Sequence, residues 1–266
     1  PGDISDKIII VGDPGRVDML AELFDEIRVR KENREFRTVT GTMAGSEITV
    51  ISSGIGTDNI DILINELDAL VNIDLKTGEP REESVSLNLI RIGTSGGLRD
   101  DVPAGSFVLT ETAVGFDGLL HFYSEFDWIL DTLLSDLLAE YLEWPDTLPY
   151  PYAVKASEQL AGFFSPEKFI RGITISAPGF YGPQGRKLRL EPFDSEMNRK
   201  LSGFTFRGKK ICNYEMESSA LYGLSALLGH KALTVCAVIG NRASGEFISD
   251  YKPLIRELAM NVLQII

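Results

Sequence analysis

Residues 7–16 of the chain read Lys-Ile-Ile-Ile-Val-Gly-Asp-Pro-Gly-Arg. The first five residues are a β-branched run that ends at a glycine, which predicts a strand at Lys7–Val11 buried on both faces of a sheet. Apolar residues between positions 17 and 24 then recur at the spacing of a helix packed on that sheet. This stretch therefore predicts a strand, a glycine-rich loop and a helix in succession.

The same alternation of strand and helix continues to the end of the chain. Residues 72–86 are polar and predict an exposed excursion, and no internal repeat or low-complexity linker divides the sequence. The pattern indicates one α/β domain over residues 1–266. The further elements predicted are strands at 47–52, 87–92, 106–112, 172–176 and 232–239, turns at 54–56 and 93–97, and helices at 60–70, 127–142 (with Leu130, Leu134, Leu137 and Tyr141 on one side), 218–228 and 254–265.

Charge and composition restrict the partners of the protein. A formal charge of -13 argues against binding to nucleic acid or to an anionic membrane surface, which require broad positive potential. No apolar run approaches the roughly 18 residues of a membrane span, and the start lacks a secretory signal. Cys212 and Cys236 lie in apolar stretches and are expected to be buried reduced thiols, which favours a cytoplasmic location. The chain starts at Pro1, so further residues are expected to precede it.

The loop after the first strand has the composition of an anion site. Gly12 and Gly15 give the backbone freedom to aim N–H groups at an anion, and Arg16 adds a charged donor fork suited to phosphate oxygens. The loop matches neither the dinucleotide nor the nucleoside-triphosphate fingerprint, which speaks against a nicotinamide dehydrogenase. Taken alone, it is equally compatible with a tight turn and a surface ion pair.

Two more segments carry arginines. Arg91 ends an apolar strand before Gly93-Thr94-Ser95-Gly96-Gly97, and an arginine there is costly unless it meets an anion. Arg34 lies in Asn33-Arg34-Glu35-Phe36, which on its own would be a solvated charge.

These three segments, in this order, resemble the nucleoside phosphorylase superfamily and within it the uridine phosphorylase branch, from about residue 8 to 265. The resemblance implies a single-domain three-layer α/β/α fold with a central mixed, partly barrel-like sheet. It implies that Gly12, Arg16, Arg91 and Thr94 bind phosphate and that Arg34 is donated by a neighbouring subunit. The active unit would then be a dimer, and the family's bacterial members resemble hexameric rings of dimers.

The segment Asn213-Tyr214-Glu215-Met216-Glu217-Ser218 places two carboxylates just before a predicted helix, where an extended backbone would aim them at one pocket. Buried carboxylates need donors, and a ribose supplies two adjacent hydroxyls. The resemblance implies that Glu217 holds these hydroxyls and Met216 packs on the sugar, with Glu215 and Thr94 in the same ribose site. The alternative is that both carboxylates cap the following helix.

Phe180-Tyr181-Gly182-Pro183-Gln184-Gly185-Arg186 distinguishes among bases. The Gln184 amide has a donor and an acceptor for a uracil edge, and Arg186 could stabilise charge on the departing base. Taken alone, the segment would be interpreted as a solvated loop, but the resemblance implies that Phe180, Gln184 and Arg186 bind the base, bordered by Ile239. The purine-specific branch has an aspartate where this chain reads Gly240-Asn241-Arg242; the first acid is Glu246. Arg242 is expected to brace Gln184 and Arg186.

The sequence also departs from the family. A site histidine near the N-terminus is absent before His121, and His121 itself is expected to be structural. Some relatives hold a monovalent cation between subunits with the glutamate that matches Glu35, but Asn59 stands where a serine is usual, so no metal is assigned. No cofactor is expected; inorganic phosphate is the co-substrate.

The predicted function is reversible phosphorolysis of uridine to uracil and α-ribose 1-phosphate, with Arg91, Gln184, Arg186 and Glu217 as catalytic residues. Alternatives on the same fold are a purine nucleoside phosphorylase, a nucleosidase that uses water, and a non-catalytic nucleoside-binding protein.

Overall fold

A computed structural model describes residues 2–265 of the chain. Its central strand is β1 (Lys7–Val11), which pairs in parallel with β4 (Ser46–Ser52) on one side and β7 (Asn88–Gly97) on the other. Ile9 and Val11 point into one hydrophobic core, whereas Ile8 and Ile10 point into another. The predicted strand buried on both faces is therefore confirmed.

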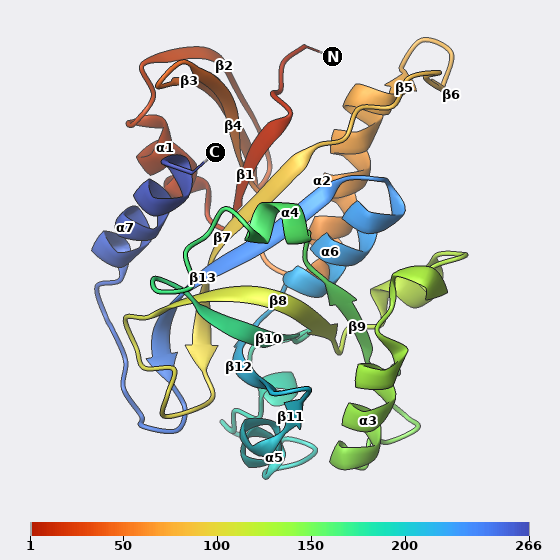
Figure 1. The fold of residues 1–266 in the computed structure, drawn as a ribbon, viewed down its shortest axis with the longest axis vertical. Coiled ribbons are helices and arrows are strands. Elements are labelled where there is room, and N and C mark those ends of the chain that lie inside the picture. The colour runs from red at the N-terminus through yellow and green to blue at the C-terminus, as the bar shows by residue number, and fades with distance from the viewer. Residues whose placement is uncertain (1, 266) are drawn as a thin grey trace.

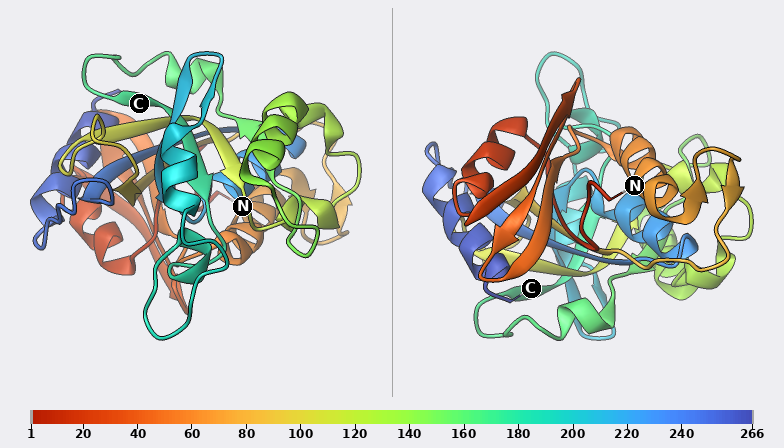
Figure 2. Two further views of the ribbon diagram at one scale, coloured as in Figure 1. Left: turned by 90° about the horizontal axis from the view of Figure 1, so that it is seen from below. Right: turned by 90° about the horizontal axis from the view of Figure 1, so that it is seen from above.

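Helices cover both faces of this part of the sheet (Figure 1). On one face lie α1 (Pro14–Ala21) and α7 (Lys252–Leu263), and on the other α2 (Thr57–Asn72) packs beside α6 (Ser218–Leu227). Figure 2 shows from above that the two pairs stand on opposite sides of the strands. The expected three-layer α/β/α fold is confirmed.

The other end of the sheet curls into a ring of five strands. In order these are β7, β13 (Lys231–Asn241), β8 (Phe107–Gly115), β10 (Ile170–Ser176) and β12 (Lys209–Glu215). The ring closes where β12 pairs antiparallel with the end of β7, through Asn213 opposite Gly97 and Tyr214 opposite Gly96. Parallel and antiparallel pairs occur together, so the expected mixed, partly barrel-like sheet is confirmed.

Shorter elements complete the domain. A third core packs α3 against β10 and β12. The remaining strands are β2 (Glu26–Asn33), β3 (Phe36–Met43), β5 (Ile73–Asp74), β6 (Glu79–Pro80), β9 (Tyr152–Lys155) and β11 (Thr205–Phe206); the remaining helices are α3 (Thr132–Leu142), α4 (Glu158–Ala161), α5 (Met197–Gly203) and the 3-10 turns Leu119–Phe122, Asp127–Ile129 and Gly182–Gln184.

Two predictions were wrong in detail. Residues 93–97 are the last five residues of β7, not a turn, and their glycines serve close approach: a Cβ on Gly93 would lie 2.3 Å from Arg91 Nη1 and 2.9 Å from Cys236 Sγ. The helix predicted over 127–142 begins only at Thr132, capped by Asp131. Its buried side carries Leu134, Leu138 and Leu142, so Leu137 and Tyr141 are exposed. The residues that face the core are therefore spaced i, i+4, i+8 along the helix, whereas the expected row was Leu130, Leu134, Leu137 and Tyr141.

Two further expectations concern the cysteines and membrane-spanning segments. Cys212 and Cys236 are free and buried, as expected. No helix within residues 2–265 is both long and apolar enough to cross a membrane.

Candidate active site

One pocket of about 710 Å³ opens at the end of the barrel beside the loop that follows β1. It gathers residues from distant parts of the chain: the β1–α1 loop, the end of β7, the 180–186 loop, the β12–α6 junction and the end of β13. With the exception of Arg34, all the predicted site residues line it, namely Gly12, Arg16, Arg91, Thr94, Phe180, Gln184, Arg186, Glu215, Met216, Glu217 and Ile239.

The glycine-rich loop is fixed by its own hydrogen bonds. Asp13 caps α1 and accepts the Gly15 N–H at 2.8 Å, so that donor is already used inside the loop. The Gly12 carbonyl accepts the Gly54 N–H at 3.0 Å, which joins the loop to the β4–α2 turn. The Arg16 guanidinium lies 5.7 Å from the centre of the Tyr251 ring at the start of α7, within cation–π range. Arg16 is thus the cation that this loop presents to the pocket.

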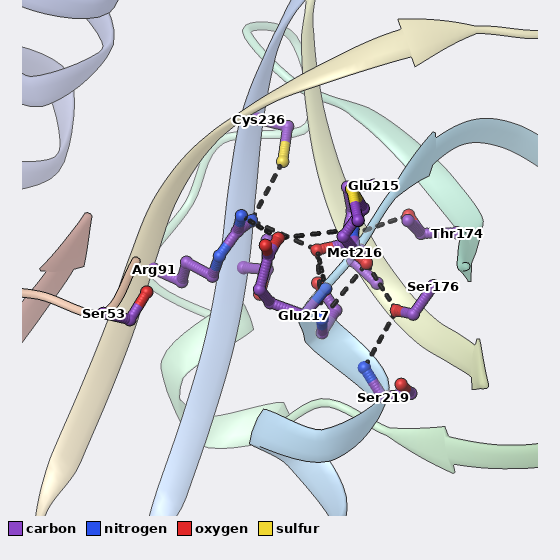
Figure 3. Close-up of polar contacts among 12 residues, drawn as sticks. Ser53, Arg91, Thr174, Ser176, Glu215, Met216, Glu217, Ser219 and Cys236 are labelled. Atoms are coloured by element: carbon purple, nitrogen blue, oxygen red, sulfur yellow. Dashed lines mark hydrogen bonds and ion pairs between the residues drawn. The ribbon is translucent and has the colours of Figure 1, made fainter. Parts of the chain in front are cut away.

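Arg91 lies at the centre of a buried ionic cluster (Figure 3). Its Nη1 is 3.1 Å from Glu215 Oε2 and 3.7 Å from Cys236 Sγ, and its Nη2 forms an ion pair with Glu217. Burial lowers the pKa of Arg91, but the charges of Glu217 and Glu215 more than offset this and raise the pKa above its usual value. The cost of burying this arginine is therefore met first by carboxylates of its own chain.

Glu215 organises the junction between β12 and α6. Its carboxylate accepts the Ser176 hydroxyl, the Glu217 N–H at 3.0 Å and the Ser218 N–H at 3.0 Å, in addition to the Arg91 ion pair. The capping alternative is therefore correct for Glu215. With so many donors around it, Glu215 is placed to hold Arg91 and the helix start, and its predicted ribose contact stays a prediction.

Glu217 is held from two sides and faces the pocket. Its Oε1 accepts the Gly56 N–H at 2.8 Å, and its Oε2 accepts the Met216 N–H at 3.3 Å beside the Arg91 ion pair. Burial raises the pKa of Glu217, and the positive charge of Arg91 opposes that shift. Three of the roughly four lone-pair sites of this carboxylate are therefore occupied, which leaves one on Oε1 for a hydroxyl donor; a second hydroxyl would replace the long Met216 contact.

The opposite end of the pocket is built around Gln184, which is almost fully buried. Arg242 donates to the Gln184 carbonyl oxygen at 3.1 Å and to its Oε1 at 2.5 Å, and lies 4.9 Å from the Tyr214 ring centre. Burial and the nearby Arg186 lower the pKa of Arg242 to about 10. Because a guanidinium can only donate hydrogen bonds, it must face the oxygen of the Gln184 side-chain amide. The NH₂ group of that amide therefore points away from Arg242. The expected bracing of Gln184 is confirmed.

Arg186 stacks on Phe180, with its guanidinium carbon 3.8 Å from the ring centre. Burial lowers the pKa of Arg186. The loop therefore brings a planar cation and an aromatic face to the same wall of the pocket as Gln184, so it is more than a solvated loop.

Arg34 lies outside the pocket of its own chain. It occupies the turn between β2 and β3 with a positive φ of 55° and is exposed. Its role in a neighbouring subunit stays a prediction.

The monovalent cation between subunits near Glu35 stays unassigned. The Asn59 amide nitrogen donates to the Ile55 carbonyl at 3.3 Å, so this oxygen already has a neutral partner. Residues 2–265 contain no group of three or more His, Cys, Asp or Glu side chains that could hold a metal ion. His121, by contrast, lies 3.0 Å from the Tyr150 carbonyl and meets Phe126 and Tyr152 edge-on, which suits a structural role.

Several residues that shape the pocket had no recognisable signal in the sequence. Tyr214 contacts Arg242 and Tyr251 contacts Arg16, and Gly56 anchors Glu217 from 161 residues away. The turn at 54–56 was predicted as a turn alone.

The fold and the site together define a nucleoside phosphorylase-like protein. They combine three layers and a partial barrel with an arginine-bearing loop at a strand end and a buried Arg–Glu pair. The chain belongs to the phosphorylase superfamily, whose family model matches residues 6–266. The family recognised from the sequence is confirmed.

The relatives point to nucleosides. The chain is 31% identical over 247 residues to a uridine phosphorylase of Thermococcus kodakarensis, which covers 93% of this chain and 77% of that protein. It is 26% identical over 244 residues to a guanosine phosphorylase of Halorubrum lacusprofundi, covering 92% of this chain and 82% of that protein. A Trypanosoma brucei nucleoside phosphorylase whose structure shows uridine phosphorylase activity matches with a TM-score of 0.84 at 27% identity, over 98% of this chain and 92% of that one.

Proposed function

We propose that the protein catalyses phosphorolysis of uridine to uracil and α-ribose 1-phosphate. One observation carries the proposal: a single pocket holds a cationic strand-end loop, a carboxylate fixed beside a buried arginine, and an amide whose oxygen is turned by a second arginine. These three groups match phosphate, ribose and a carbonyl-bearing base in turn.

In this proposal, a phosphate oxygen attacks C1′ from the face opposite the base. The C1′–O bond forms, the C1′–N1 bond breaks, and the electron pair of that bond goes to N1 of uracil. Gly12, Arg16, Arg91 and Thr94 hold the phosphate in near-attack geometry. Arg91 Nε, which has no hydrogen-bond partner among residues 2–265, is the donor left for a phosphate oxygen.

Glu217 and the base-end groups act on the leaving step. Glu217 accepts the ribose hydroxyls and lies close to a sugar that becomes oxocarbenium-like, while Met216 packs on the sugar. Gln184 and Arg186 donate to uracil carbonyls, and these bonds strengthen as the base gains negative charge. Phe180 and Ile239 supply apolar walls for the ring.

A purine is the second candidate for the leaving base. Glu246 lines the pocket near the end of β13, although it lies several residues beyond the place where the purine branch has its acid. In this second candidate, the Glu246 carboxyl would donate a proton to the departing purine. One relative of the chain, the guanosine phosphorylase, is named for a purine nucleoside.

Substrate assays separate the candidates. Purified protein is incubated with uridine, inosine or guanosine, with and without phosphate, and the free base is quantified. We expect uracil release that requires phosphate. Release of a purine base with uridine intact would overturn the base assignment. Uracil release in phosphate-free buffer would identify a nucleosidase, and uridine binding without turnover would identify a nucleoside-binding protein.

We further propose that the active unit is a homodimer, within a hexameric assembly, in which Arg34 completes the phosphate site of the neighbouring subunit. Mixing inactive Arg16→Ala and Arg34→Ala proteins under subunit exchange should restore activity, because one site of each mixed dimer then contains both arginines. No recovery despite exchange would refute donation across the interface. The buried free thiols of Cys212 and Cys236 support a cytoplasmic location, and phosphorolysis of uridine would give the protein a role in pyrimidine salvage.

A further inference from the structure

A second, smaller pocket of about 260 Å³ lies beside the strands β10 and β12. Its walls are the turn between β7 and β8, the start of β10, and the hairpin of β11 and β12. It shares no lining residue with the active-site pocket. Four of its lining side chains are cations: Arg99, Arg171, Lys209 and Lys210.

The cations around this pocket outnumber the carboxylates that pair with them. Arg99 Nε and Lys210 Nζ share one carboxylate, Asp101, at 2.9 and 2.7 Å, and Lys209 Nζ pairs with Glu111 at 2.9 Å. Two carboxylates therefore face four cations, an excess of two positive charges on a chain whose net charge is -13. Such a local field attracts a dianion.

The walls of the pocket are held in place before any ligand arrives. Arg171 Nη2 donates to the carbonyls of Ala161 at 3.0 Å and Phe164 at 2.5 Å, which fixes its guanidinium. Arg171 Nε is buried and finds no hydrogen-bond partner within the described part of the chain. Such a buried donor is costly unless it meets an acceptor.

The facing turn is equally constrained. The side-chain NH₂ group of Asn241 donates to the carbonyls of Arg99 and Val102, both at 2.7 Å. This residue ends β13, so the turn is tied to the wall of the active-site pocket as well. A pocket with preset walls loses less entropy on binding than one formed from a mobile loop.

We propose that this pocket binds the phosphoryl group of a small phosphorylated ligand or of inorganic phosphate. The dianion takes donors from Arg171 and from Lys209 and Lys210, whose exposed ammonium groups rearrange from their carboxylates, and Arg99 contributes charge. The chemistry recognised is the phosphoryl dianion, and the two sources differ in whether a sugar is attached to it.

Equilibrium dialysis with radiolabelled phosphate tests the proposal by counting sites per chain. Wild-type protein should bind two phosphates per chain, and Lys209→Ala/Lys210→Ala protein should keep one, with affinity at the second site lowered about tenfold or more because two charge-assisted contacts are lost. Lys187→Ala is the matched control, since Lys187 is an exposed lysine paired with Glu191. A double variant that binds as many phosphates per chain as the wild type, with the same affinities, would overturn the proposal, whether or not the active site also binds phosphate.

Ribose 5-phosphate separates the two sources. If ribose 5-phosphate displaces labelled phosphate from the second site of the wild type at lower concentrations than unlabelled phosphate does, the ligand is a phosphorylated sugar. If higher concentrations are needed, the ligand is inorganic phosphate. Both readings require a site that the double variant lacks. The dialysis measures no turnover, so its outcome is independent of the substrate assays.

Discussion

Replacing Arg242 with alanine should impair recognition of the base and leave phosphate binding intact. The guanidinium makes two hydrogen bonds to Gln184, and the one to Oε1, at 2.5 Å, fixes which way the amide faces. A hydrogen bond to a charged group contributes about 1.5–3 kcal/mol. If that stabilisation is expressed when the base departs, kcat/KM for uridine should fall about 10- to 150-fold.

Steady-state kinetics with each substrate varied in turn measure this effect. The KM for phosphate should change little, because Arg242 lies at the base end of the pocket, away from Arg16. Arg242→Lys keeps the charge but loses the two-pronged geometry, so an intermediate loss is expected. Arg189→Ala, at an exposed arginine in the same loop as Arg186, is the matched control.

Two results would refute this reasoning. A kcat/KM for uridine within about twofold of wild type would mean that the Gln184 orientation contributes nothing to the reaction. Equal losses for uridine and phosphate would mean that Arg242 supports the whole pocket, not the base end.

Three further predictions follow from other contacts. Arg16→Ala should raise the KM for phosphate far more than that for uridine, and Tyr251→Leu should do so more weakly while Tyr251→Phe keeps the wild-type value, because the ring face holds Arg16; equal effects on both substrates would contradict this. Burial lowers the pKa of His230, although the charge of Asp68 opposes this shift, so the folded protein favours the neutral ring. The free energy of unfolding should therefore fall as the pH drops below about 6.5. In urea unfolding at pH 7.5 and 5.5, His230→Gln should show a smaller difference between the two pH values than the wild type; an equal difference would contradict this prediction. Glu215→Gln should cost about 3 kcal/mol in urea unfolding and most of the activity, since Arg91 loses a buried counter-charge; a wild-type unfolding midpoint would show the carboxylate to be dispensable.

The sequence predicted the fold where hydrophobic periodicity is strong. β1, β4, α2, α6, β13 and α7 lie within a few residues of their expected positions, because the strands are continuous apolar runs and the helices bury apolar residues at helical spacing. The strand β2 was not predicted, because it reads EIRVRKEN and only Ile27 and Val29 are partly buried. Its partner β3 reads FRTVTGTM, in which threonines and a glycine interrupt the apolar pattern. The glycines of β7 predicted a turn because a sequence does not reveal what a missing Cβ would touch.

The site divides in the same way. Arginines and carboxylates in glycine-rich segments were recognisable, and eleven of the predicted residues line one pocket. Most of their partners were not: the capping of α6 by Glu215 was one alternative, but the sequence says nothing of the ion pair between Glu215 and Arg91, or of the Gly56 N–H reaching Glu217. Those contacts join positions far apart in the chain and depend on how the barrel closes.

The closure of the barrel through β12 and β7 also has a consequence for how the protein is made. Arg91 and Glu217 are 126 residues apart, and β13, which pairs with both β7 and β8, is the next-to-last element of the chain. A nascent chain therefore carries an unpaired arginine within an apolar strand until its last part leaves the ribosome, and long-range closures of this kind are slow. Recovery of activity during refolding should accordingly lag behind recovery of secondary structure, because it reports the moment when the ring of strands shuts.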